Sequence, residues 1–491
     1  MLFTSAIFVF AYLPVTFAVF FIIGRINRVA AAAWLAAASI FFYGWWDYHY
    51  VPLLAVSIVF NFAMSRQIAA AQEPTRRKLL LAVAVAAALG LLAYFKYKNF
   101  LLSVVTDQPL AALGHLVIPL GISFYTFTQI AFLVDTYRRE AHEPSFVHYV
   151  LFVTYFPHLI AGPIIHHKEM MPQFRDPSTY SPKLSDFNEG AMFFVIGLFK
   201  KVVIADGVAP FADALFGAAG NGHPIGLAAS WSGALAYTAQ IYFDFSGYSD
   251  MAIGLSLLFG IRLPLNFASP YQSANIIEFW RRWHMTLSRF LRDYLYISLG
   301  GNRKGPARRY LNLFLTMLLG GLWHGAGWTF VIWGALHGTY LMVNHGWHAL
   351  SRAARNRPPK PSYVGRFASW LVTFLAVVVA WVFFRADTVT SAGAIVGAMF
   401  GFGGFDLTAH TLSNALATAE FWWIVIPLAL ALLAPNSQDI VARASAYLRA
   451  ASAARREAFA FVSLGAIAVI VPLCVVIAES KASPVFIYFN F

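Results

Sequence analysis

The sequence predicts an all-α polytopic membrane protein, because it is rich in apolar residues and these residues form long, repeated segments. Of the 491 residues, 59% are hydrophobic and 12% are charged, whereas soluble domains carry about 25% charged residues. Apolar segments of roughly 17–25 residues, the length that crosses a bilayer, recur almost from end to end, and we expect about ten to twelve transmembrane passes. The clearest segments are Leu2–Ile23, Val29–Trp46, Leu79–Tyr94, Trp370–Phe384 and Phe459–Ala478.

Positive charge is concentrated between the apolar segments. The chain has 35 Lys and Arg against 22 Asp and Glu, which gives a net charge of +13. Basic clusters such as Arg25–Arg28, Thr75–Lys78 and Gly300–Arg309 separate apolar runs, which is typical of cytoplasmic loops under the positive-inside rule. We therefore expect a multi-pass protein of the cell inner membrane and no nucleic-acid partner. The first apolar segment lacks a basic start and opens a series of spans, which indicates a retained helix rather than a signal peptide.

The composition also argues against metal and thiol chemistry. Cys474 is the only cysteine, so the chain cannot form an internal disulfide or a thiolate metal cluster. The sequence contains no HExxH motif. We therefore expect no metal and no permanently bound cofactor.

The unusual polar residues divide the chain into three blocks. Residues 1–110 are predicted to form N-terminal transmembrane helices, and residues 351–491 to form C-terminal transmembrane helices separated by basic loops. Residues 111–350 contain nearly all polar residues that lie in apolar surroundings. The chemistry is therefore expected in the middle block.

Two segments of the middle block, Ile118–Phe127 and Phe156–Glu169, are interrupted by proline and glycine. Irregular backbone at membrane depth occurs only where protein buries it or where it lines a watery cavity. A third segment, Tyr242–Gly254, contains Asp244 and Tyr248, which are candidates for orienting a pocket because ionisable residues within membranes are costly. The alternative, favoured for Asp244, is that these polar groups hydrogen-bond neighbouring helices.

The segment Asn275–Gly301 is predicted to be one amphipathic helix near the membrane surface. At about 100° per residue, its leucines and aromatic residues share one arc and its charged residues share the opposite arc. His284 falls on the apolar arc, where a hydrogen-bonded packing histidine is more common than a catalytic one. The charged arc contains Glu278, Arg281, Arg282, Arg289, Arg292 and Asp293.

The apolar stretch Leu315–Gly338 contains two histidines, His324 and His337. A helix from the basic loop that ends at Arg309 would carry His324 about 22 Å inward, at about 1.5 Å per residue. That depth lies within a hydrocarbon core about 30 Å thick. Burial there favours a neutral imidazole, which can accept a proton as a general base. The alternative is a histidine that bonds a neighbouring helix.

The residues around His324 are expected to form a pocket. Gly325 and Gly327 should open the helix and leave room for a substrate beside the imidazole ring. Trp323 and Trp328 are candidates for the pocket walls.

The other histidines are given no role in the chemistry. His337 lies some 220° round a continuous helix from His324, so the two are poorly placed to share a ligand. His345 and His348 lie towards a helix end and are expected to pack or to face the membrane interface. His166–His167 are expected to be a surface pair.

Five motifs between Ile118 and Gly338 resemble the membrane-bound O-acyltransferase family, and specifically its bacterial alginate O-acetyltransferase branch. They occur in the family's order, and the N-terminal "MLFTSAIFVFAYLPV" and C-terminal "SPVFIYFNF" also resemble that branch. The motifs are "IPLGISFYTF", "FPHLIAGPI", "YFDFSGYSDMAIG", "EFWRRWHMTLSRFLRDYLYISLGGNR" and "FLTMLLGGLWHGAGWTFVIWGALHG".

This resemblance implies transmembrane, re-entrant and amphipathic helices around a central tunnel that is open to an acyl donor from the cytoplasm. It assigns the catalytic histidine to His324, in "GLWHG", and the second active-site position, asparagine in many relatives, to His284, in "RRWH". It further implies acetyl transfer from acetyl-CoA to an extracytoplasmic polysaccharide such as alginate. A partner of the SGNH-hydrolase type and the polysaccharide-synthesis machinery would complete the transfer.

For that chemistry, His324 is the expected base, and His284 either positions a reactant or donates to the oxyanion. A basic face could attract the phosphates of acetyl-CoA, although a solvated face near anionic lipid explains it equally well. That face consists of Arg281, Arg282, Arg289 and Arg292. The competing function is a transporter or flippase for a polysaccharide or lipid-linked intermediate, with the broken helices as its binding site.

Overall fold

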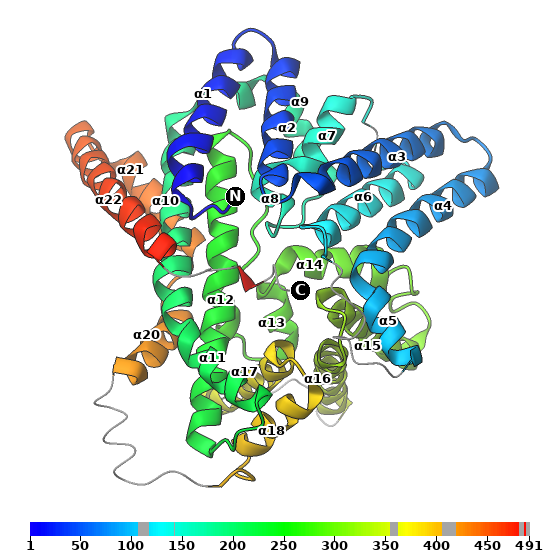
Figure 1. Cartoon of the computed structure of the whole chain (residues 1–491), viewed down its shortest axis with the longest axis vertical. Helices are drawn as coiled ribbons and strands as arrows, with labels where there is room; N and C mark the ends of the chain where they lie inside the picture. Colours follow the sequence, from blue (N-terminus) through cyan, green and yellow to red (C-terminus); the bar gives the residue numbers. More distant parts are fainter. Residues whose placement is uncertain (107–116, 142, 354–361, 405–418, 481–485, 488–491) are drawn as a thin grey trace. The chain divides into compact units, whose positions relative to one another are not determined.

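The described part of the chain has only helices as regular secondary structure. No strand occurs among the described residues, so the predicted all-α class is confirmed (Figure 1). The predicted boundary between residues 110 and 111 lies outside the described residues, and the boundary between residues 350 and 351 remains a prediction. The structure, a computed structural model, describes residues 1–106, 117–141, 143–353, 362–404, 419–480 and 486–487.

Several described helices are apolar enough for a bilayer. Three are also long enough to cross it, namely Tyr48–Ala70, Pro74–Thr106 and Tyr363–Arg385. A fourth span results if Phe421–Leu433 and Ser437–Ala450 are counted as one broken helix. Other apolar helices have 10–17 residues, which is short for a straight span of about 20 residues. The number of passes therefore remains a prediction. The figure of about ten to twelve comes from the length of segment that crosses a bilayer.

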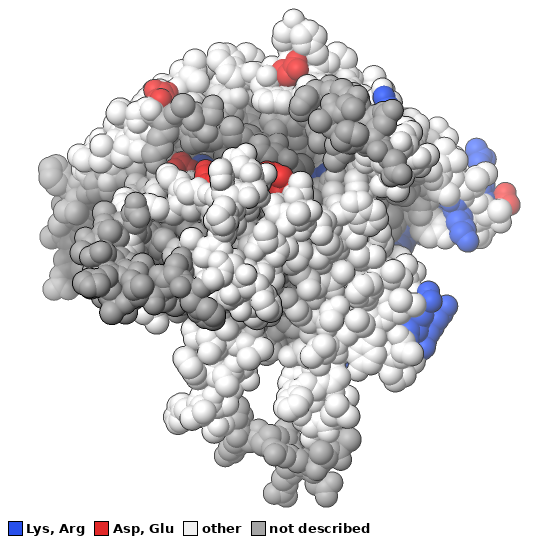
Figure 2. Space-filling model, turned by 60° about the horizontal axis from the view of Figure 1, so that its bottom comes forward, with Lys and Arg blue, Asp and Glu red and all other residues white. Residues whose placement is uncertain are grey.

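Large apolar side chains face outwards from the candidate spans. Leu79, Val83 and Leu89, in the helix that begins at Pro74, are all exposed. Figure 2 shows a face on which most visible side chains are uncharged, with Lys and Arg gathered near one edge. Apolar surface of this kind suits contact with lipid rather than with water, in agreement with a membrane protein.

The chain forms two units that alternate along the sequence. The first unit comprises Met1–Phe199, Tyr248–Leu265 and Ser437–Phe489. The second comprises Lys200–Gly247, Asn266–Asn436 and Asn490–Phe491. The long helix α12 therefore contributes its beginning to the second unit and its end to the first.

In the first unit, α3, α4 and α6 pack on one another around Met64, Ile68, Ala84 and Leu133 (Figure 1). Its helices are η1 (Phe8–Tyr12), α1 (Leu13–Gly24), α2 (Arg28–Gly44), η2 (Tyr48–Tyr50), α3 (Val51–Ala70), α4 (Pro74–Leu92), η3 (Ala93–Tyr97), α5 (Lys98–Thr106), α6 (Ile122–Tyr137), α7 (Phe146–Thr154), α8 (Phe156–Leu159), α9 (His167–Arg175), η5 (Pro177–Tyr180), α10 (Leu184–Phe199), the end of α12 (Leu227–Leu258), α21 (Ser437–Ala450) and α22 (Ala453–Ser480).

The two segments expected to be irregular are interrupted as predicted. Helix α6 begins only after Gly121, which has a φ of 69°. A Cβ atom at Gly121 would lie 2.7 Å from the carbonyl oxygen of Leu159, so both the backbone conformation and the close approach require glycine. The chain is likewise non-helical between the end of α8 and the start of α9.

In the second unit, the predicted single helix over Asn275–Gly301 is wrong. Helix α13 ends at Arg282, and α14 begins at Met285. The second unit contains η6 (Lys200–Ala205), α11 (Asp206–Gly220), the start of α12, η7 (Pro270–Gln272), α13 (Ile276–Arg282), α14 (Met285–Phe290), η8 (Leu291–Tyr296), α15 (Gly305–His324), α16 (Trp328–Ala353), α17 (Tyr363–Arg385), α18 (Val389–Met399) and α20 (Ala419–Leu433).

Candidate active site

The helical hairpin formed by α15 and α16 carries both His324 and His337. Its backbones touch at small residues: a Cβ at Gly321 would lie 2.3 Å from the carbonyl oxygen of Phe330, and a Cβ at Gly334 would lie 2.5 Å from that of Met317. Glycines allow helices in membranes to approach this closely. The backbones of α15 and α16 therefore approach each other closely at these two glycines.

Helix α15 runs without interruption from the basic loop to His324, as predicted. It ends there because Gly325 has an extended backbone, with φ −157° and ψ 150°. The space beside Gly325 is not left for a substrate, however, because a Cβ there would lie 2.1 Å from Cε2 of Phe330. At Gly327 a Cβ would be in ordinary van der Waals contact with Phe330, at 3.7 Å. The expectation that Gly325 provides room was wrong.

His324 is buried in an aromatic wall. Its relative exposure is 4%, and its ring centroid lies 4.9 Å from Trp323, 5.1 Å from Trp333 and 5.2 Å from Phe384. Trp323 therefore lies against His324, and its role as a pocket wall stays a prediction. Trp328 begins α16 with 55% of its surface exposed, and its role as a pocket wall stays a prediction.

His284 is fully buried between α13 and α14 and has an unusual backbone. Its φ of 42° and ψ of 55° lie in the left-handed region, which few residues other than glycine adopt. The ring lies edge-on to Phe245 at 4.7 Å and reaches Trp323 at 6.4 Å. A conformation of this kind costs on the order of 1–3 kcal/mol and persists only where the surroundings enforce it.

A hydrogen bond fixes which nitrogen of His284 carries the proton. Nδ1 lies 3.0 Å from Oδ1 of Asn266, and the same oxygen accepts bonds from the hydroxyl and the backbone N–H of Thr286. An amide oxygen only accepts, so Nδ1 must donate to it. The neutral ring therefore presents a lone pair, not a proton, at Nε2.

The four arginines of the proposed donor face differ in their surroundings. Arg282 pairs with Glu278 at 2.7 Å, as its i,i+4 spacing predicts. Arg292 makes a two-point contact with the adjacent Asp293, at 2.7 and 3.2 Å. Arg281 is exposed, and Arg289 is half-buried. Acidic neighbours thus offset part of the charge at Arg282 and Arg292.

The two candidate orienting residues, Asp244 and Tyr248, belong to different units. Asp244 forms an ion pair with the buried Lys201, whose Nζ lies 2.6 Å from Oδ1 of Asp244. The same Nζ lies 2.8 Å from Oδ1 of Asp206. This contact supports the interhelical explanation for Asp244. Tyr248 belongs to the first unit, where it stacks between Phe3 and Phe486 at 4.8 and 4.5 Å.

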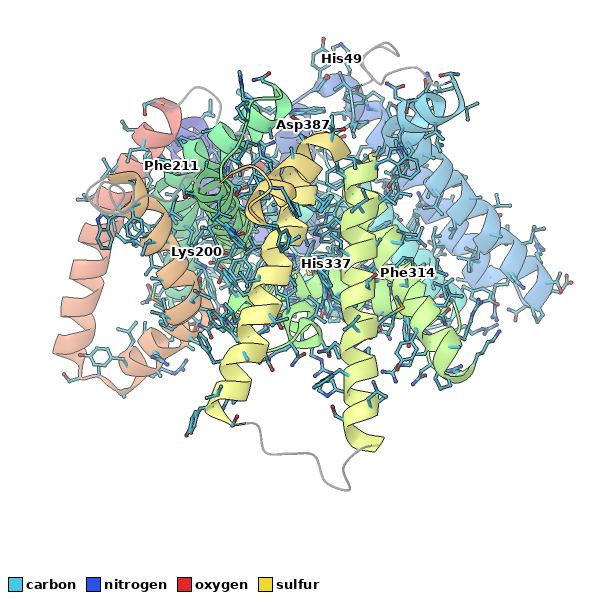
Figure 3. The ribbon with its side chains drawn as sticks, turned by 90° about the horizontal axis from the view of Figure 1, so that it is seen from below. His49, Lys200, Phe211, Phe314, His337 and Asp387 are labelled. Carbon is cyan, nitrogen blue, oxygen red and sulfur yellow. The ribbon has the colours of Figure 1, made fainter. Side chains whose placement is uncertain are left out.

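The predicted separation of His337 from His324 depends on a helix that does not continue. The rotation of 220° assumed a continuous helix, but the chain is interrupted between α15 and α16. The indole of Trp333 contacts both imidazoles: its ring centroid lies 5.1 Å from that of His324 and 4.7 Å from that of His337. Figure 3 labels His337 between the ribbons of α16 and α17. Gly325 and Gly327, which follow His324, were the available signal that the helix is interrupted before His337.

The expected surface pair is partly buried instead. His167 is 6% exposed, and the carboxylate of Asp135 lies 2.9 Å from Nε2 of His166 and 3.2 Å from Nδ1 of His167. The potential metal-binding atoms of these three side chains all lie within 4.8 Å of one another. Among the described residues, they form the group that could hold a metal ion. Their contacts with one another also give the two imidazoles a structural role at the start of α9.

Comparison with known proteins identifies the family. Residues 92–384 match the membrane-bound O-acyltransferase family. The chain is 44% identical over 437 residues to a peptidoglycan O-acetyltransferase of Helicobacter pylori, covering 83% of this chain and 81% of that protein. It is 45% identical over 425 residues to the "Probable alginate O-acetylase AlgI" of Pseudomonas aeruginosa, covering 84% and 78%. A teichoic acid D-alanyltransferase of Streptococcus thermophilus is 27% identical over 245 residues, which are 46% of this chain and 57% of that protein.

The matched region contains both candidate catalytic histidines, His324 at the end of α15 and His284 between α13 and α14. It covers more than half of the chain, and the two O-acetyltransferases align with most of its length. The apolar helices agree with the membrane location that the family name states. This chain is therefore an acyltransferase and belongs to the membrane-bound O-acyltransferase family.

Proposed function

We propose that this chain is an O-acetyltransferase of the inner membrane, which takes an acetyl group from cytoplasmic acetyl-CoA and passes it to an extracytoplasmic polysaccharide. The observation that carries the proposal is His324, a buried imidazole at the end of α15 with aromatic rings on three sides. The relatives' names support acetyl as the transferred group. Alginate and peptidoglycan, named for those relatives, are the first acceptors to assay.

His324 supplies the base for this reaction. It takes the proton of an attacking hydroxyl, whose oxygen bonds to the thioester carbonyl carbon. When the tetrahedral intermediate collapses, the carbon–sulfur bond breaks, and the imidazolium returns its proton to the leaving thiolate. A partner of the SGNH-hydrolase type then completes delivery to the polysaccharide, together with the polymer-synthesis machinery. The basic face formed by Arg281, Arg282, Arg289 and Arg292 attracts the donor's phosphates.

His284 positions a reactant in this proposal. The proton held at Nδ1 by Asn266 leaves Nε2 as an acceptor for a hydroxyl or thiol proton. Donation to the oxyanion, the other role predicted from the sequence, would require a second proton on a buried ring, which burial disfavours. The hydrogen bond therefore supports positioning over oxyanion stabilisation.

Replacing Asn266 with leucine is expected to lower acetyl transfer roughly 10²-fold, because a small misplacement of a positioned group has an effect of that size. Acetyl ester in the polysaccharide, quantified by infrared spectroscopy at matched membrane levels of protein, checks this. Thr286→Val is the control, since it removes one bond to the same oxygen and keeps the bond to His284. Normal acetylation in Asn266→Leu would exclude the positioning role.

Membrane vesicles test the proposed function directly. Inner-membrane vesicles that contain the chain, its partner and the polysaccharide receive acetyl-CoA labelled in the acetyl group, on the cytoplasmic face or on the opposite face. We expect labelled polysaccharide only with donor on the cytoplasmic face. A transporter predicts a different result: cells without the chain would still make acetylated polysaccharide but retain it inside.

A further inference from the structure

A group of buried polar atoms next to the candidate active site has no protein hydrogen-bond partner among the described residues. His337 is 0% exposed, and both of its ring nitrogens lack a hydrogen-bond partner among the described residues. So do the indole nitrogens of Trp280, Trp333 and Trp381, each of which is buried. These four side chains, the His337 cluster, contribute five such atoms.

The atoms belong to one contiguous cluster within the second unit. The His337 ring lies 4.7 Å from Trp333, 5.2 Å from Trp280 and 6.3 Å from Trp381. Trp333 and Trp381 stack at 6.0 Å. The cluster therefore joins three helices, α13, α16 and α17, around one imidazole.

Such a cluster is energetically unfavourable unless something pairs with it. A buried polar group without a partner costs roughly 1–3 kcal/mol, and native proteins contain few of them. Phenylalanine in place of each tryptophan would fill similar space without that cost. The concentration of these atoms beside His324 therefore points to a ligand that bonds them.

The side chains define the chemistry of that ligand. An indole N–H only donates, whereas a neutral imidazole donates at one nitrogen and accepts at the other. The ligand must therefore offer several acceptors and at least one donor. The walls are uncharged aromatic rings, so the ligand group must be uncharged, because an unpaired charge in such surroundings is strongly disfavoured. Amide groups on a flexible, otherwise apolar chain meet all three requirements.

The position of the cluster selects one part of the acyl donor. Trp333 contacts both His324, where the thioester reacts in the proposed function, and His337. Trp280, another member of the cluster, is followed by the exposed Arg281 on α13, where an anionic head group would be solvated and paired. In acetyl-CoA, the segment between thioester and phosphates is an arm with two amides and a hydroxyl.

We infer that Trp280, Trp333, Trp381 and His337 form a subsite that binds the amide-bearing arm of the acyl thioester donor. This inference rests on the proposed function, since acetyl-CoA is the donor there. The indole N–H groups donate to amide carbonyls, and His337 exchanges a donated and an accepted hydrogen bond with the arm. The subsite thereby sets the depth at which the thioester meets His324.

Binding to the purified full-length protein in detergent tests the subsite. The probes are pantetheine, which is the arm alone, and adenosine 3′,5′-bisphosphate, which represents the head alone, each titrated by calorimetry. We expect His337→Phe and Trp381→Phe each to weaken pantetheine binding about three- to tenfold, the worth of one or two hydrogen bonds, with unchanged affinity for the head. His337→Asn, which keeps a donor and an acceptor, should restore part of the loss.

The matched control is His348→Phe, an exposed histidine on the same helix. Steady-state transfer in membranes gives the second readout: the KM for acetyl-CoA should rise three- to tenfold, about the same factor as the binding loss, with a smaller change in kcat. Equal pantetheine affinity in wild type, His337→Phe and Trp381→Phe would overturn the subsite. If the wild type binds pantetheine but transfers no acetyl group from acetyl-CoA, the proposed function fails and the subsite does not. Bisphosphate binding by each variant shows that it is folded.

Discussion

Replacing His324 with alanine is expected to lower acetyl transfer by about 10²- to 10⁴-fold, the usual contribution of a general base, while the protein still inserts into the membrane. The structure places this imidazole at the end of α15, almost fully buried and enclosed by Trp323, Trp333 and Phe384. No hydroxyl would be deprotonated in the alanine variant, so the thioester would persist. The acetyl content of the polysaccharide, measured by NMR, checks the result.

Two further variants separate chemistry from folding at this position. His324→Gln keeps most of the side-chain volume within the aromatic wall, and the same loss of activity is expected because an amide is not a base at neutral pH. His348→Ala, at an exposed position of α16, should acetylate normally. Full acetylation by either His324 variant, at wild-type abundance in the membrane, would remove His324 from the mechanism.

Replacing Lys201 with methionine is expected to destabilise the protein by about 3–5 kcal/mol, the usual effect of removing one partner from a buried ion pair. The Lys201 ammonium lies 2.6 Å from Asp244 and 2.8 Å from Asp206, and all three side chains are at most 11% exposed. Without the lysine, two carboxylates would remain close together with little water to stabilise them. The midpoint of thermal unfolding in detergent measures the loss.

Lys200→Met is the matched control for this change, because the neighbouring lysine is more exposed and rests on the ring of Tyr242. A second variant tests the cause. Combining Lys201→Met with Asp206→Asn and Asp244→Asn removes the uncompensated charge, so part of the stability should return. An unfolding midpoint that does not move in Lys201→Met would show that the triad contributes little to the fold.

The sequence allowed the helical class and the position of His324 to be predicted because both depend on local signals. Apolar runs of bilayer length specify helices, and the glycine at position 325 marks the end of α15. Proline and glycine likewise marked the interruption before α6. Such residues act on their own backbone, so no knowledge of the tertiary structure was needed.

Features that depend on distant partners could not be predicted. No glycine or proline marks the break at His284, where the bond to Asn266 holds the ring in place. The role of Lys201 in the ion-pair triad has no local signal, because its carboxylate partner at position 244 is far along the chain. The role inferred for His337 depends on α13 and α17, which helical periodicity within one segment cannot reveal.

The left-handed backbone at position 284 limits which amino acids can replace the histidine during evolution. Apart from glycine, asparagine, aspartate and histidine adopt this conformation most readily, whereas β-branched and bulky residues are strained there. Among these four, only histidine and asparagine are both uncharged when buried and able to hydrogen-bond on two sides. The repertoire at this site is thus restricted by main-chain geometry before any demand of catalysis is considered.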